Sequence, residues 1–120
     1  MAAETDAEAR RLFTTPQQQF ARLVRGTRGL LPPPIDDIEA FWSPAEKAQA
    51  SRMLARSLVG ARETIRAGLE VLAAETGADE LMVATALHDH AARRRSYAIL
   101  AEAHGGLDAA ADGAPERSAA

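Results

Sequence analysis

The stretch GADELMVATALHDHAARRRSYAIL, Gly77–Leu100, decides the fold of this chain, because its pattern predicts a strand, a short loop and a helix in succession. Gly77 is placed to end the preceding helix. Leu81–Thr85 is a short apolar run between turn-forming residues, which is typical of a strand buried on both faces. Asp89 then stands at a helix N-cap position, where its carboxylate can accept hydrogen bonds from the free N–H groups of the first turn.

The helix predicted after Asp89 has one buried side. Spacings of three and four residues bring four small or apolar positions to one face, with Tyr97 and Leu100 on its flank. These four positions are Ala92, Ser96, Ile99 and Ala103.

A strand buried on both faces needs helices on each side and strands along both edges. Apart from Leu81–Thr85, the chain offers one other short extended stretch, Ser57–Gly60. One or two strands cannot form such a sheet. The sequence therefore predicts a piece of a larger α/β fold, mostly helical, with one or two short parallel strands.

Composition narrows the function classes. The chain has 120 residues, 47% of them hydrophobic and 26% charged, which is typical of a globular chain. The net charge of −3, from 14 basic and 17 acidic residues, gives no electrostatic reason to expect nucleic acid. The absence of cysteine excludes disulfides and thiolate metal ligands and fits a cytoplasmic protein. No apolar run has the length of a membrane span, and the first residues lack the apolar core of a secretion signal.

Helix signals divide the first half of the chain. Thr5–Glu8 has the form of a capping box, so a helix is expected to begin there. Pro16 either kinks this helix or stands at the first position of a second helix capped by Thr15. Gly26 is the expected stop.

A proline-rich connector, Pro32–Pro34, follows, and we expect it to act as a stiff spacer rather than as a ligand for a proline-binding partner. A short helix carrying Phe41 and Trp42 is predicted to begin at Asp36–Glu39. Ser43–Glu46 forms a second capping box, with proline at the first helical position, and its helix is expected to end near Ala55 or Arg56.

The second half repeats the alternation of extended and helical segments. Ser57–Gly60 is brief and extended, and Arg62–Thr76 has the apolar periodicity of a helix. The glycine pair at 105–106 is expected to end the last helix. Residues 107–120, rich in alanine, aspartate and glycine, are predicted to be a disordered tail.

The most reactive-looking cluster is His88–Asp89–His90. A metal site needs three or four converging ligands, and two histidines beside an aspartate that serves as a helix cap do not supply them. We therefore predict no metal. The three arginines at 93–95 point in directions about 100° apart on a helix, so they predict a solvated surface rather than one basic stripe.

Four segments of the chain together resemble the C-terminal end of the luciferase-like, flavin-dependent monooxygenases. They are AETDAEARRL (3–12), LPPPIDDIEAFWSPAEKA (31–48), SLVGARETIRAGLE (57–70) and ADELMVATALHDHAARRRSYAIL (78–100). The resemblance covers residues 2–104. One departure stands at Ala61-Arg62, where the family leads us to expect serine or threonine followed by proline.

The resemblance implies the C-terminal part of a (β/α)8 TIM barrel over residues 1–104. Within it, residues 26–56 would be a helical insertion, residues 57–104 would be the final strand and helices, and residues 105–120 would be the tail. Loops after the carboxyl ends of barrel strands form the active-site face. His88 is therefore the candidate catalytic residue, and Thr85 is a candidate neighbour of the substrate. Phe41 and Trp42 lie in the insertion, either against substrate or as a hydrophobic plug.

The function implied is that of a flavin-dependent monooxygenase or oxidoreductase that uses FMN or a related flavin or deazaflavin on a small organic substrate. Because most flavin-binding strands are missing, we expect a truncated or split barrel that is inactive alone. Its partner would be the remainder of the barrel or a second copy, with no nucleic acid and no membrane. The alternative is a non-catalytic helical interaction module or split-enzyme subunit, which would use the Phe41–Trp42 segment and the edges of Leu81–Thr85.

Overall fold

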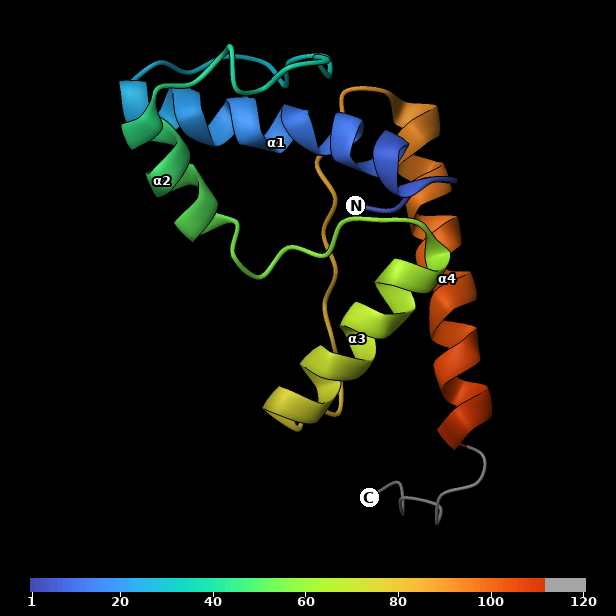
Figure 1. Ribbon diagram of the computed structural model, residues 1–120. Coiled ribbons are helices and arrows are strands. Elements are labelled where there is room, and N and C mark those ends of the chain that lie inside the picture. Colours follow the sequence, from blue (N-terminus) through green and yellow to red (C-terminus); the bar gives the residue numbers. More distant parts are fainter. Residues whose placement is uncertain (112–120) are drawn as a thin grey trace.

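The computed structural model describes residues 1–111, and the surroundings of side chains through residue 105. It holds four helices: α1 Asp6–Arg25, α2 Pro44–Met53, α3 Arg62–Thr76 and α4 His90–Ala111. Figure 1 shows them as two pairs, α1 with α2 and α3 with α4. No strand forms within residues 1–111. None of the helices in this part of the chain is long and apolar enough to cross a membrane.

The helix boundaries follow local signals in the sequence. The Thr5 hydroxyl accepts from the Glu8 N–H at 3.1 Å, and Ser43 and Glu46 complete a reciprocal capping box at the start of α2. Gly26 and Gly77 end α1 and α3 in the left-handed conformation, with φ of 79° and 63°. The Asp89 carboxylate accepts from the Ala92 N–H at 2.9 Å, as predicted. α2 is shorter than predicted, because Leu54 already serves as its C-cap.

α1 is a single helix that includes Pro16, so the alternative of a second helix beginning at Pro16 is wrong. Thr15 does not cap a helix there. Its hydroxyl instead donates to the Pro32 carbonyl at 2.9 Å, while Gln18 donates to the Pro33 carbonyl at 3.0 Å. These bonds hold the proline-rich connector along α1. They tie both sides of Pro16 to a second segment, and tertiary contact overrides the local cost of proline.

The short helix predicted to begin at Asp36–Glu39 and to carry Phe41 and Trp42 is a turn instead. The Asp37 side chain accepts from the Glu39 N–H at 3.0 Å, which is a local bond that competes with helix formation. The N–H groups of Phe41 and Trp42 both donate to the Ile38 carbonyl, at 2.9 and 3.3 Å.

The prediction that the glycine pair at 105–106 ends the last helix was also wrong, because α4 continues to Ala111. Each glycine inside a helix costs about 1 kcal/mol relative to alanine, and the alanine-rich sequence around the pair favours helix. Of the tail predicted over residues 107–120, the part after Ala111 lies outside the described residues.

Two separate clusters of buried side chains stabilise the two helix pairs. The first joins α3 and α4 to the first residues of the chain, and it consists of Ala2, Ile65, Leu69, Ile99 and Ala103, with Leu58 and Leu100 packed against it. The second joins α1 and α2 to the turn before α2, and it consists of Ala21, Trp42 and Ala50, with Phe20, Ile38 and Phe41 packed against it.

The predicted buried strand at Leu81–Thr85 does not form. The segment is extended but unpaired, and Met82 is fully exposed while Leu81 and Val83 are each 41% exposed. A strand of this apolar composition is stable only between neighbouring strands, and the described residues provide none at its edges. In Figure 1 it lies within the long connection between the end of α3 and the start of α4.

Candidate functional site

The first two extended segments, residues 1–3 and 58–60, lie parallel to each other. The Met1 nitrogen donates to the Leu58 carbonyl at 2.8 Å, and the Gly60 N–H donates to the Met1 carbonyl at 3.1 Å. The Ala3 N–H donates to the Gly60 carbonyl at 3.3 Å. Ala2 and Gly60 form an isolated parallel bridge. Ser57–Gly60 thus takes part in a single β-bridge rather than forming a full strand, and it runs parallel to residues 1–3.

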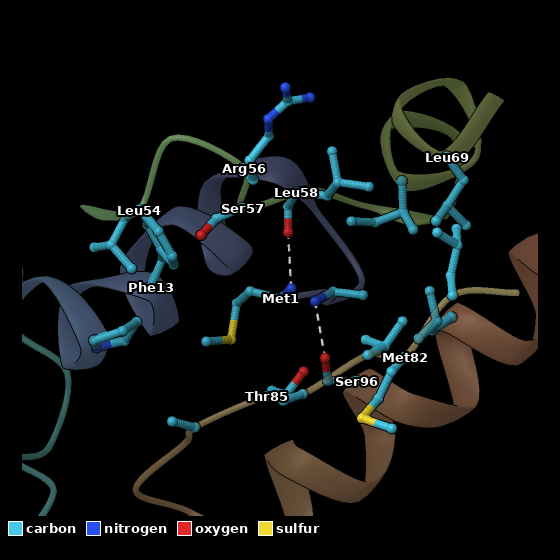
Figure 2. A pocket seen from close by; sticks show the side chains of 18 of the residues that line it. Met1, Phe13, Leu54, Arg56, Ser57, Leu58, Leu69, Met82, Thr85 and Ser96 are labelled. Carbon is cyan, nitrogen blue, oxygen red and sulfur yellow. Dashed lines mark hydrogen bonds between the residues drawn. The ribbon is translucent and has the colours of Figure 1, made fainter. Parts of the chain in front are cut away.

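An open cavity of about 510 Å³ lies between these segments, a third extended segment at residues 81–85 and the helices around them. Figure 2 shows Met1, Leu58 and Met82 at its wall. Its lining is mainly aliphatic and aromatic, with few polar side chains: Gln19, Arg56, Ser57, Thr85 and Ser96. The cavity is therefore bounded mainly by apolar side chains.

Of the predicted site residues, only Thr85 lines this cavity. Its backbone N–H donates to the Tyr97 hydroxyl of α4 at 3.0 Å. The sequence predicted Thr85 as a neighbour of the substrate, and this stays a prediction.

His88 lies apart from the cavity and is exposed. Its Nδ1 is 3.0 Å from the Leu31 carbonyl oxygen at the start of the proline-rich connector. Because a carbonyl can only accept, the Nδ1 atom carries the proton, and Nε2 is the acceptor of the neutral ring. His88 thus joins the loop before α4 to the connector.

Phe41 and Trp42 do not line the cavity, and both belong to the α1–α2 cluster. Trp42 is 8% exposed, and its indole N–H donates to the Glu39 carboxylate at 3.2 Å. The Arg25 guanidinium stacks 4.5 Å from the centre of the Phe41 ring. This packing is that of a hydrophobic plug. It also leaves little of Trp42 for the partner surface that the alternative interpretation required.

An ion pair between the exposed Arg25 and the mostly buried Glu46 fastens this plug to both helices. Arg25 of α1 binds both carboxylate oxygens of Glu46, with Nη2 at 3.0 Å from Oε1, and also donates to the Phe41 carbonyl. Glu46 accepts from the Ser43 N–H at 2.7 Å as well. The Arg25 guanidinium, and secondly the Ser43 N–H, lower the pKa of Glu46 from 4.5 to about 2.

Acid is therefore expected to weaken the α1–α2 unit. The folded chain holds Glu46 ionised down to about pH 2, whereas the unfolded chain takes up a proton near pH 4.5. The stabilisation is fully present above that unfolded pKa and is lost as the pH falls toward 2. Melting temperatures of wild type and Glu46→Gln, measured from pH 7 to pH 2, should differ most at pH 7 and converge in acid.

Arg25→Met removes the largest cause of the low pKa of Glu46 and is expected to make the pH dependence of stability weaker than in wild type, as Glu46→Gln does. The double variant should lose less than the sum of the two single variants, because both changes abolish the same Arg25–Glu46 ion pair. Melting curves of wild type and Glu46→Gln that stay the same distance apart down to pH 2 would contradict the assignment.

Three groups that organise the site were not found from the sequence. The Asp6 carboxylate accepts from the Ala61 N–H at 2.7 Å and from the Thr64 hydroxyl at 2.8 Å. These bonds lower the pKa of Asp6, the Ala61 bond most of all. They replace the local cap that Ala61 cannot provide at the start of α3. The others are the Ser96 hydroxyl, which accepts from the Ala2 N–H, and the Tyr97 hydroxyl. The four hydrogen bonds of these groups join residues 12 to 94 positions apart, so spacing in the sequence gave no signal.

Within the described residues, no three His, Asp or Glu side chains are grouped in a way that could hold a metal ion. The cluster His88–Asp89–His90 is divided among three structural roles. His88 contacts the connector, Asp89 caps α4, and the His90 ring is hydrogen-bonded to Arg93 at 2.7 Å.

No protein-family model matches the chain. The luciferase-like monooxygenase of Escherichia coli strain K12 is 43% identical to it over 99 residues, which are 82% of this chain and 30% of that protein. The uncharacterized protein YvbT of Bacillus subtilis strain 168 is 42% identical over 102 residues, 85% of this chain and 30% of that protein. The crystal structure of apo-MsnO8 superimposes with a TM-score of 0.65 at 33% identity, covering 87% of this chain and 32% of that one.

The chain is therefore a homologue of the luciferase-like monooxygenases, as the resemblance of its four segments predicted. It spans about 30% of the length of the curated relatives that it matches.

Proposed function

We propose that the chain forms the C-terminal part of a luciferase-like (β/α)8 barrel, and that it acts together with the rest of that barrel, on the same polypeptide or on a second one. The observation that carries this proposal is the order of its elements. Three extended segments, residues 1–3, 58–60 and 81–85, are each followed by a helix, and the first two are already paired in parallel. Parallel strands that alternate with helices are the repeating unit of such a barrel.

The described residues do not by themselves fit a flavin. The cavity lining is mainly aliphatic and aromatic, and its arginine, Arg56, is 3.5 Å from the Glu75 carboxylate. The Ser96 hydroxyl is occupied by the Ala2 N–H at 2.9 Å. No glycine-rich cradle for a phosphate borders the cavity. We therefore propose that FMN, or a related flavin or deazaflavin, binds only when the remaining barrel strands are present, and that this chain alone is not a monooxygenase.

In the completed barrel, Thr85 and His88 would lie on the face where barrel enzymes place their active sites, because both follow or end the third extended segment. The Leu31 carbonyl fixes the Nδ1–H form of His88, so Nε2 is the ring atom that could accept a proton or hydrogen bond from a substrate. We assign His88 that role within the proposal, with Thr85 as a neighbour. Phe41 and Trp42 are assigned to the plug rather than to the substrate.

Titration of the purified chain with FMN tests whether flavin binding depends on the remaining barrel strands. We expect no binding at micromolar concentrations, observed as unchanged flavin fluorescence and a colourless protein after desalting. The matched experiment adds the part of the Escherichia coli relative that lies outside the matched 99 residues. Flavin binding should then appear. Micromolar binding by the chain alone would contradict the dependence on the missing strands.

A further inference from the structure

Two backbone N–H groups of the extended segments, those of Ala2 and Thr85, take no part in the existing parallel pair. Met1 and Ala3 both bond to the segment 58–60. Successive residues of an extended strand direct their hydrogen-bonding groups to opposite edges, so the Ala2 N–H faces the other edge. Figure 2 shows these two directions as dashed lines, one to Leu58 and one to Ser96.

Hydroxyl groups of α4 accept hydrogen bonds from both of these N–H groups. The Ser96 hydroxyl, on a side chain that is 2% exposed, accepts from the Ala2 N–H at 2.9 Å. The neighbouring Tyr97 hydroxyl accepts from the Thr85 N–H at 3.0 Å. Adjacent residues of one helix thus satisfy two N–H groups, 83 positions apart, that carbonyls of neighbouring strands would satisfy in a sheet.

We propose that these two edges are the docking site for parallel strands from the remaining part of a luciferase-like barrel, and that Ser96 and Tyr97 cap them until those strands arrive. The inference rests on the proposed function and adds a competition between α4 and the incoming strands. The occupant follows from the length of the relatives, since about 70% of their chain lies outside the match. It follows also from the chemistry of the edge, where Leu81, Met82 and Val83 expose apolar side chains beside the open cavity.

Capping of this kind has a measurable consequence. A strand that docks must replace the hydroxyl at each N–H, so the wild-type chain gives up a hydrogen bond on binding. Without the hydroxyl, the N–H is unpaired only in the free chain, and docking satisfies it. From the usual net value of a hydrogen bond, removal of each hydroxyl should tighten binding about two- to tenfold.

The test is a competition between wild type and Ser96→Ala, or wild type and Tyr97→Phe, carrying different tags. They compete for a limiting amount of the Escherichia coli luciferase-like monooxygenase polypeptide that lacks its matched 99 residues. The captured fraction should favour each variant two- to tenfold. Ser51→Ala, on the exposed side of α2, is the matched control and should be captured equally with wild type. Hydrogen exchange of the Thr85 amide should also accelerate in Tyr97→Phe, with the helical circular dichroism unchanged.

The outcomes separate the two proposals. If wild type and variants are captured equally, the capping role is overturned while the barrel proposal stands. If the polypeptide captures neither wild type nor variants, both are overturned. If the variants instead form dimers with themselves in sedimentation, the occupant of these edges is a second copy, and our assignment is wrong.

Discussion

Replacing Ile65 by alanine is expected to lower the free energy of unfolding by about 2–5 kcal/mol. The side chain is 1% exposed and lies in the cluster that joins α3, α4 and the first residues of the chain. Removing it deletes apolar contacts and leaves a cavity that the surrounding backbone can fill only in part. Since domains of this size are stable by about 5–15 kcal/mol, the loss is a large share of the total. Urea denaturation followed by the helical circular dichroism signal measures it.

Val71→Ala is the matched control on the same helix. Val71 is 56% exposed, so its truncation should change the free energy of unfolding by no more than about 0.5 kcal/mol. The contrast between the two positions tests whether the α3–α4 cluster is a packed core in this chain without further barrel strands. Equal effects at Ile65 and Val71 would mean that the cluster is loosely formed.

The features that local sequence determines were predictable. The Ser43–Glu46 box, the Asp89 cap, and the glycines that end α1 and α3 were all confirmed, because each depends on residues within one turn of a helix. The bounds of α3 also match the prediction, although its first residue lacks a side-chain cap. The family likewise followed from the order of four segments.

The errors arose where distant segments decide the local structure. Pro16 stays inside α1 because the connector is bonded to the residues around it. Leu81–Thr85 has the composition of a buried strand but lacks neighbours in the described chain, so it remains extended and exposed. The candidate site shows the same limit. The sequence predicts the end of a strand at Thr85 and a loop at His88, but it does not reveal that the α4 hydroxyls accept from the Ala2 and Thr85 N–H groups.

Gly60→Ala is expected to destabilise the chain by about 1–3 kcal/mol, because no space exists for the added methyl group. A Cβ at Gly60 would lie 2.5 Å from Thr64 Cγ2 and 2.7 Å from Asp6 Oδ1. Asp6 and Thr64 cannot both move away, since the same Asp6 oxygen holds the Ala61 N–H at 2.7 Å and the Thr64 hydroxyl at 2.8 Å. The backbone cannot move either without breaking the parallel pairing to Met1 and Ala3.

Gly105→Ala provides a control of opposite sign. A Cβ there meets nothing within 4 Å, and the residue lies inside α4, so alanine should stabilise the chain by about 0.5–1 kcal/mol. Chemical denaturation of both variants therefore separates a steric effect at Gly60 from the general preference for alanine over glycine. If Gly60→Ala were as stable as wild type, Asp6 and Thr64 would not be holding the segment 58–60 in place. The parallel pair that supports the barrel proposal would then be too loosely fixed to direct the pairing of further strands.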